Sequence, residues 1–289
     1  MSKNINSKAT LVQFNISIWT GRKYDRKALE AIEQKYNNAS DSCSATKQLL
    51  GGKNPELEAI KQIACKARQC HYEMTLPWDK GRSLLPNKLH DRYCEKMREF
   101  EREFITHVNI FLGEYPRFVN EARFLLNGLY NPLDYPDQWD LVKKFNMSFA
   151  VEPLPTFGDF RLDDLSQDRV NEHSQALETR INEKFKAAQR DVYQRLLDVT
   201  KNLFERTKDP KAIFRDTLIG NVRDLVSIME GLNLQDDSKL HELTKQLETI
   251  TDGIEAQDLR NDSKLRNETS KQAEKILYDI ENEMAQFSM

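Results

Sequence analysis

The stretch VNEHSQALETRINEKFKAAQRDVYQRLLDVTKNL, residues 170–203, decides the fold class of this chain. Its apolar and weakly polar side chains recur three or four residues apart, which predicts one long helix with a single packed face. The average step of about 3.7 residues is close to that of a straight helix, so the pattern requires no supercoil. The members of this stripe are Val170, His173, Leu177, Ile181, Phe185, Ala188, Val192, Leu196, Val199 and Leu203.

Two shorter seams follow toward the C-terminus. The first, from Leu240 to Ile254, has the alternating spacing of three and four residues that is typical of coiled coils. The second runs from Ala273 to Phe287, after a polar stretch. These seams either pack back on the 170–203 helix or join subunits, and self-association into a homo-oligomer is one prediction of the pattern.

The N-terminal half combines strands with helices. Apolar and polar side chains alternate from Val12 to Ile18 and again from Met147 to Val151, so we expect these two strands to pair, with 157–162 as a third. Gly113 and Pro116 are expected to end a long helix. Helices are predicted over 23–37, 55–74, 87–111 and 118–129, and loops over 76–86 and 130–139.

Together these patterns predict a mainly α fold with a small antiparallel β-sheet (α+β) and long C-terminal helices of coiled-coil type. We expect a basic α+β front domain over 1–160 and an acidic helical, coiled-coil region over 161–289. Residues 1–100 carry 18 Lys and Arg against 11 Asp and Glu, whereas the remaining residues carry 25 against 35. A basic front of this kind favours a polyanionic partner.

Composition excludes several classes of protein. Ten glycines in 289 residues are about half the usual share, which argues against propellers, barrels and glycine-rich nucleotide loops. No apolar run reaches the length of about 18 residues that a membrane span requires, and no apolar signal core follows the N-terminus. We therefore expect a cytoplasmic protein without membrane contact, whose four cysteines are reduced thiols.

No pattern of catalytic or metal-ligating residues stands out. The chain lacks GxSxG and GxxxxGK[ST], and a turn before the next helix explains the Gly-Gly-Lys at 51–53. The CxxC pairs of structural zinc sites are also absent. We therefore expect no enzyme, no catalytic residue, no metal and no cofactor, although five side chains are of types that zinc accepts: Cys65, Cys70, His71, His90 and Cys94.

Three stretches together carry a resemblance to a known family. They are WTGRK at 19–23, HYEMTLPW at 71–78, and FAVEPLP at 149–155 followed by GDFR at 158–161. Over roughly residues 8–235 the chain resembles a domain of unknown function that is common in tailed bacteriophages and prophages. The resemblance implies a phage origin and a role in the cytoplasm of the infected bacterial host. Because that family has no established active site, it implies no functional residue.

Basic and aromatic residues interleave in the front region. Bases stack on exposed aromatic rings, and Lys and Arg neutralise phosphates, so this mixture favours single-stranded DNA. In the alternative interpretation, the indoles belong to the core and the cations only solvate the surface. The residues that we predict to bind nucleic acid are Trp19, Arg22, Lys23, Lys27, Trp78, Lys80 and Arg82.

The sequence thus predicts a non-enzymatic phage protein that binds single-stranded DNA, oligomerises, and recruits phage RNA polymerase or replication proteins. The acidic, apolar-ended tip at 279–289 either recruits such enzymes or continues the helical seam. The alternative function is a protein–protein adaptor or assembly factor without nucleic-acid affinity, serving a phage ATPase or acting against host defence.

Overall fold

The computed structural model describes residues 7–36, 42–155, 166–209, 212 and 215–287. Contacts divide the chain into two compact units, and this division differs from the predicted boundary at residue 160. Both units combine segments that are distant in sequence. Unit 1 comprises Met1–Gln13, His71–Cys94 and Ala150–Met289, and unit 2 comprises Phe14–Cys70 and Glu95–Phe149.

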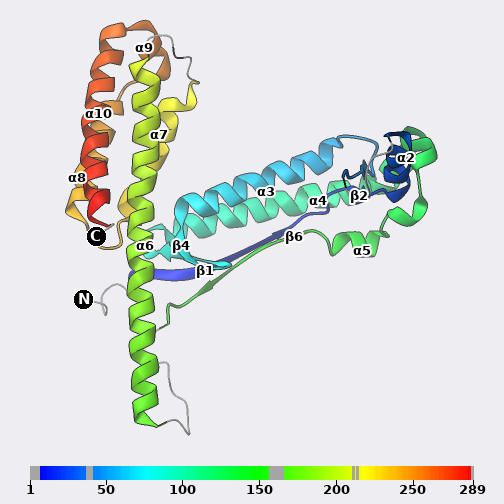
Figure 1. Ribbon diagram of the computed structural model, residues 1–289, viewed down its shortest axis with the longest axis horizontal. Coiled ribbons are helices and arrows are strands. Elements are labelled where there is room, and N and C mark those ends of the chain that lie inside the picture. Colours follow the sequence, from blue (N-terminus) through cyan, green and yellow to red (C-terminus); the bar gives the residue numbers. More distant parts are fainter. Residues whose placement is uncertain (1–6, 37–41, 156–165, 210–211, 213–214, 288–289) are drawn as a thin grey trace. The chain divides into compact units, whose positions relative to one another are not determined.

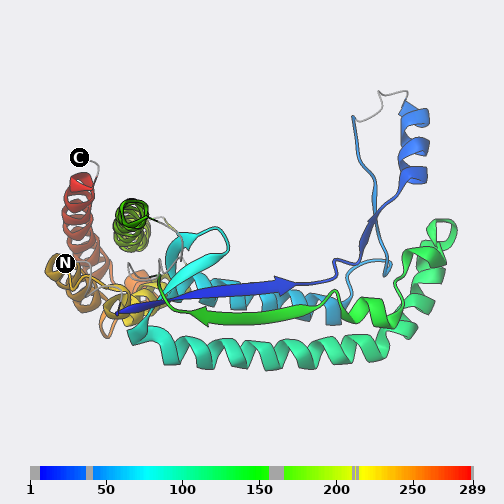
Figure 2. The same ribbon diagram turned by 90° about the horizontal axis from the view of Figure 1, so that it is seen from below.

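The predicted fold class, mainly helical with a small antiparallel sheet, is confirmed. The strand order of the four-stranded sheet is β4-β5-β1-β6, so the expected pairing of the N-terminal strand with the mid-chain strand is present (Figure 2). The predicted third strand at 157–162 lies outside the described residues. The strands are β1 (Ala9–Ser17), β4 (Leu76–Asp79), β5 (Arg82–Pro86) and β6 (Asn146–Glu152).

The predicted loop at 76–86 is wrong, because these residues form the β4–β5 hairpin. Leu76 pairs with Leu84, and Gly81 makes the turn with a φ of 86° that favours glycine. The two prolines that suggested a loop are tolerated for separate reasons. Pro77 lies where the register shifts, and Pro86 ends its strand, so neither interrupts a regular ladder.

The predicted helix break at Gly113 and Pro116 is also wrong. One helix, α4 (His90–Leu126), continues through both residues. A proline has no N–H to bond the carbonyl four residues earlier, which here belongs to Leu112. The side chain of Gln138 fills this vacancy, since its Nε2 lies 3.3 Å from the Leu112 carbonyl oxygen and donates to it.

Unit 2 is built around the greater part of two helices that lie side by side, α3 (Pro55–Met74) and α4 (Figures 1 and 2). The predicted bounds of α3 are confirmed. Buried residues of α3 include Ile60 and Ala64, and those of α4 include Phe104 and Phe111. The unit also contains β2 (Arg22–Tyr24), α2 (Arg26–Tyr36), β3 (Thr46–Gln48), the short helices η2 (Asn127–Leu129) and η3 (Pro132–Asp134), and α5 (Gln138–Val142).

Unit 1 is dominated by the long helix that the 170–203 stripe predicts, α6 (Gln167–Lys208). The helix α10 (Ser263–Gln286) packs along α6, and α8 (Ser238–Thr251) packs against α7 (Thr217–Leu232) and α10 (Figure 1). The unit also contains η1 (Asn87–Leu89) and α9 (Ala256–Asn261).

The two C-terminal seams are buried inside unit 1. Leu243 and Leu247 of the first seam and Ile276 and Ile280 of the second are at most 2% exposed. Their apolar spacing is therefore satisfied by intramolecular packing. The homo-oligomer stays a prediction, and an interface between subunits would have to use residues other than these buried ones. Among the described helices, none has the length and apolarity that would let it traverse a bilayer.

Candidate functional site

The seven residues predicted to bind nucleic acid are distributed over both units. Unit 2 contains Trp19, Arg22, Lys23 and Lys27, and unit 1 contains Trp78, Lys80 and Arg82. A single groove formed by all seven stays a prediction. Within each unit, the surroundings of each side chain decide what it can bind.

Trp19 belongs to the core of unit 2. Its side chain is only 8% exposed. The ring centroids of Trp19 and Phe111 are 6.0 Å apart, and those of Trp19 and Tyr115 are 5.8 Å apart with an edge-on geometry. The indole is therefore covered by aromatic neighbours, and in this fold it has no free face on which a base could stack.

Trp78 attaches the β4–β5 hairpin to helix α6. The Lys184 ammonium lies 5.2 Å from the centre of the indole, and the Phe185 ring packs against it edge-on. Lys184 also donates to the Trp78 carbonyl at 2.8 Å and forms an ion pair with Asp79. A cation of the same unit thus already occupies the aromatic surface that was expected to receive a base.

Two of the five predicted cations are compensated by nearby carboxylates. Lys23 Nζ lies 2.7 Å from Asp134 Oδ1, and the Arg82 guanidinium lies 3.6 Å from both Asp79 and Glu152. The other three, Arg22, Lys27 and Lys80, are exposed and form no ion pair within the described ranges of the chain. These three keep the charge that phosphate binding requires.

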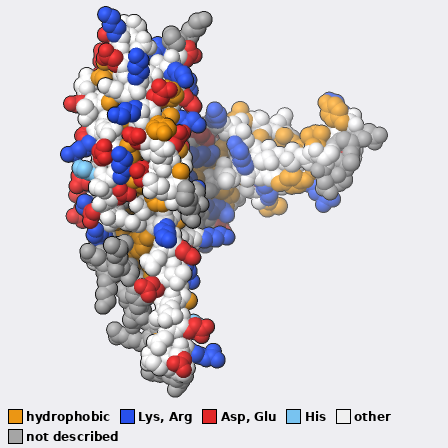
Figure 3. Space-filling model, turned by 60° about the vertical axis from the view of Figure 1, so that its left-hand side comes forward, with side chains coloured by type: hydrophobic (Ala, Val, Ile, Leu, Met, Phe, Trp, Pro, Cys, Tyr) orange, Lys and Arg blue, Asp and Glu red, His pale blue; other side chains and the backbone are white. Residues whose placement is uncertain are grey.

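Folding removes most of the charge asymmetry that the sequence suggested. Unit 2 has 17 Lys and Arg against 15 Asp and Glu, a net charge of +2, because acidic residues after position 100 join the basic N-terminal segment. Unit 1 has 26 against 31, a net charge of −5. On the face of unit 1 in Figure 3, acidic and basic side chains are interspersed. Neither unit carries the strongly positive field of a typical nucleic-acid-binding domain.

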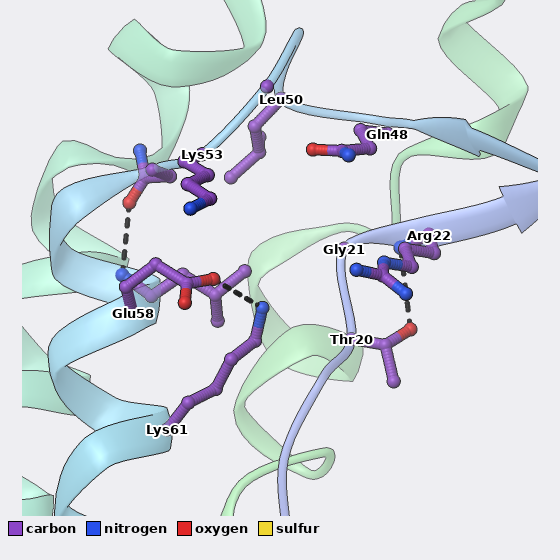
Figure 4. Close-up of a pocket in the computed structure, with 11 residues that line it drawn as sticks. Thr20, Gly21, Arg22, Gln48, Leu50, Lys53, Glu58 and Lys61 are labelled. Atoms are coloured by element: carbon purple, nitrogen blue, oxygen red, sulfur yellow. Dashed lines mark hydrogen bonds and ion pairs between the residues drawn. The ribbon is translucent and has the colours of Figure 1, made fainter. Parts of the chain in front are cut away.

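A polar pocket of about 110 Å³ lies in unit 2, where β2 and β3 approach the first turns of α3. In Figure 4 the charged ends of Arg22, Lys53 and Lys61 point toward one space that also holds the Glu58 carboxylate. A hydrogen bond from Lys61 keeps the pKa of Glu58 below its ordinary value, and the charges of Lys53 and Arg22 add to this effect. Other residues that line the pocket are Thr20, Gly21, Gln48, Leu50, Gly52, Asn54 and Leu57.

Among the residues that the structure describes, the three most exposed large apolar side chains lie in one segment of unit 2, residues 124–142, where the sequence predicts a helix end and a loop. Phe124, Leu133 and Trp139 are 82%, 87% and 83% exposed. Figure 3 shows hydrophobic side chains at the surface of this unit. The sequence does contain one sign of this exposure, the run Phe124-Leu125-Leu126. Three consecutive apolar residues in a helix cannot all lie on its buried face. Leu125, Leu129 and Val142 are also exposed.

The backbone of the 124–142 segment is held in place although several of its apolar side chains face solvent. Tyr135 Oη donates to the Leu49 carbonyl at 2.6 Å, Tyr115 Oη donates to the Pro136 carbonyl at 3.1 Å, and Lys47 Nζ donates to the Leu129 carbonyl at 2.9 Å. The exposure is therefore a feature of an ordered surface. A pre-ordered surface loses less conformational entropy when it binds a partner.

The charged side chains of the 124–142 segment all have partners within unit 2. The segment contains three carboxylates and no Lys or Arg. Asp134 pairs with Lys23 and Lys47, Asp140 pairs with Lys143 at 2.8 Å, and Asp137 caps α5 by accepting from the Asp140 N–H. The surface thus offers apolar contact area without an unpaired cation, which favours an apolar partner over a polyanion.

Comparison of the chain with protein-family models, with curated proteins and with solved structures finds no match. The resemblance to the phage family therefore stays a prediction. Within the described residues, no three His, Cys, Asp or Glu side chains are grouped closely enough to hold a metal ion. Unit 2 thus offers two candidate sites, the polar pocket and the 124–142 segment.

Proposed function

We propose that the protein is a non-enzymatic adaptor that binds another protein through the 124–142 segment. The observation that carries the proposal is the exposure of Phe124, Leu133 and Trp139 on a segment whose backbone is fixed by hydrogen bonds. Burying one such side chain gains about 1.5–3 kcal/mol. Exposed apolar side chains that gather on a surface mark interaction sites, and tryptophan is enriched among the residues that dominate binding energy.

The adaptor proposal agrees better with the surroundings of the aromatic and apolar side chains than single-strand binding does. Both predicted indoles are engaged within their own units, Trp19 in a core and Trp78 beneath Lys184. Leucines such as Leu125 and Leu133 contribute apolar area but neither stack on bases nor contact phosphates. The phage resemblance favours a partner present in the cytoplasm of an infected bacterium, such as a phage ATPase or a host defence protein.

We expect the double substitution Phe124→Ser and Trp139→Ser to abolish capture of the partner from an extract of the native cells. Both side chains would lose the apolar area that the partner buries, a loss of about 3 kcal/mol or more in binding. The measurement is affinity capture with the full chain, followed by mass spectrometry of the proteins retained.

The matched control replaces two exposed apolar residues outside the segment, Ile105→Ser and Tyr278→Ser, which are 51% and 64% exposed. We expect this control to capture the same proteins as the wild type. Identical capture profiles for wild type, control and the Phe124/Trp139 variant would contradict the proposal. Circular dichroism of each variant verifies that it is folded.

Single-stranded DNA binding is the second candidate function, and the free cations Arg22, Lys27 and Lys80 favour it. In this proposal the protein would recruit phage RNA polymerase or replication proteins to the strand. The cations would act without help from Trp19, so the affinity would be mainly electrostatic and strongly dependent on salt.

For this second candidate we expect Arg22→Ala to reduce the slope of log affinity against log salt by about one. Lys23→Ala should change the slope less, because Asp134 already compensates the Lys23 charge at 2.7 Å. Fluorescence polarisation with a labelled oligonucleotide at several salt concentrations measures both slopes. Wild-type slopes in both variants, or no binding by the wild type, would reject the nucleic-acid proposal.

A further inference from the structure

The polar pocket beside α3 holds more positive than negative charge. Three cations line it, Arg22, Lys53 and Lys61, and Glu58 is the one acid among its lining residues. Lys61 Nζ lies 2.8 Å from Glu58 Oε1, so these two charges cancel. Arg22 and Lys53 form no ion pair with any residue that the structure describes. The pocket therefore has an excess of two positive charges.

This excess is unusual within its surroundings. The neighbouring cations of the β2–β3 ribbon are compensated, Lys23 by Asp134 and Lys47 by both Asp25 and Asp134. Two uncompensated cations that line one small pocket repel each other, and the repulsion grows as solvent is excluded. A role in packing would not require such a pair, whereas a bound anion would remove the repulsion.

The positive charge of the pocket comes from side chains and not from the end of the helix. The N–H groups of Leu57 and Glu58 in the first turn of α3 already donate to the side chain and the carbonyl of Asn54. Any anion in the pocket would thus be held mainly by the guanidinium of Arg22 and the ammonium of Lys53.

We propose that this pocket binds a phosphate group. A phosphate monoester carries a charge of about −1.5 to −2 near neutral pH, which matches the charge excess. The planar fork of arginine suits two phosphate oxygens, and lysine adds a point charge. Thr20, Gln48 and Asn54 supply neutral polar groups around the same space. The inference is independent of the adaptor function, because it rests on different residues of unit 2.

The test is isothermal titration of the full chain with inorganic phosphate at constant ionic strength. We expect saturable binding with one site per chain, and a weakening of at least about five-fold in Arg22→Ala and in Lys53→Ala. Lys66→Ala removes an exposed cation of α3 that forms no ion pair within the described residues and does not line the pocket, so it should leave the affinity unchanged. Glu58→Gln removes the resident negative charge and should tighten binding several-fold, an effect that misfolding cannot produce.

Two further arms identify the source of the phosphate group. A short oligonucleotide with a 5′-phosphate is compared with the same oligonucleotide without it, each in competition with inorganic phosphate. Competition that depends on the 5′-phosphate assigns the pocket to a nucleic-acid terminus, whereas phosphate binding without competition assigns it to a small phosphorylated molecule. The absence of saturable binding by all three ligands, or an equal loss in Lys66→Ala and Arg22→Ala, overturns the proposal.

Discussion

Replacing Trp19 by alanine is expected to lower the free energy of unfolding by about 3–5 kcal/mol, the usual cost of removing a buried large aromatic side chain. The indole is 8% exposed and packs against Phe111 and Tyr115, so its removal leaves a cavity in the core of unit 2. Chemical denaturation followed by circular dichroism measures the shift of the transition.

Trp139→Ala is the matched control for this substitution. It removes the same side chain from the same unit, but at a position that is 83% exposed. We expect its denaturation midpoint to equal that of the wild type, because exposed side chains contribute little to stability. If Trp19→Ala and Trp139→Ala unfolded at the same denaturant concentration, Trp19 would not be a core residue and its predicted stacking role would be restored.

The second large effect is expected from Lys47→Ala. Lys47 Nζ lies 3.0 Å from Asp25 Oδ2 and 2.6 Å from Asp134 Oδ2, and all three side chains are at most 11% exposed. Removing the ammonium leaves two carboxylates with little access to water, and it also removes the hydrogen bond to the Leu129 carbonyl. We expect a loss of about 2–4 kcal/mol. Lys143→Ala, which breaks the exposed pair with Asp140, should leave the denaturation midpoint unchanged.

The same cluster should make the stability of unit 2 sensitive to acid. The Ala28 N–H and Lys47 hold the pKa of Asp25 below its ordinary value. Burial alone would raise the pKa of Asp134, but Lys23 and Lys47 outweigh it and lower that pKa. This stabilisation is complete above the ordinary carboxyl pKa of about 4 and is lost as the pH falls through the lowered values. Lys47→Ala should flatten this acid dependence, and an unchanged dependence would contradict the assignment.

Local patterns were sufficient to predict some of the regular elements of the fold. The apolar spacing of α6 and the bounds of α3 follow from helical periodicity, and the pairing of β1 with β6 follows from alternation together with the need of a strand for a partner. Prolines led to wrong predictions in two places, the β4–β5 hairpin and the middle of α4. A helix continues through Pro116 because Gln138, which is distant in sequence, bonds the carbonyl that the proline leaves free.

The candidate site was less predictable because charge compensation is a property of the tertiary structure. Nothing near Lys23 in the sequence shows that Asp134 neutralises it, whereas Arg22, one residue earlier, stays free. Likewise, Trp19 and Trp139 are each followed by a polar residue, yet Trp19 lies in a core and Trp139 faces solvent. Apolar residues in a stretch with proline and aspartate suggest a loop, and the hydrogen bonds of Lys47, Tyr115 and Tyr135 show that this segment is fixed.

The most direct test of the account is site-specific photo-crosslinking from position 139 in the native cells, compared with crosslinking from position 278. A photoreactive phenylalanine analogue replaces Trp139 in one protein and Tyr278 in the other. We expect a discrete crosslinked product with a different protein from position 139 and none from position 278. No product from position 139, or the same product from both positions, would contradict the claim that the 124–142 segment is a protein-docking surface.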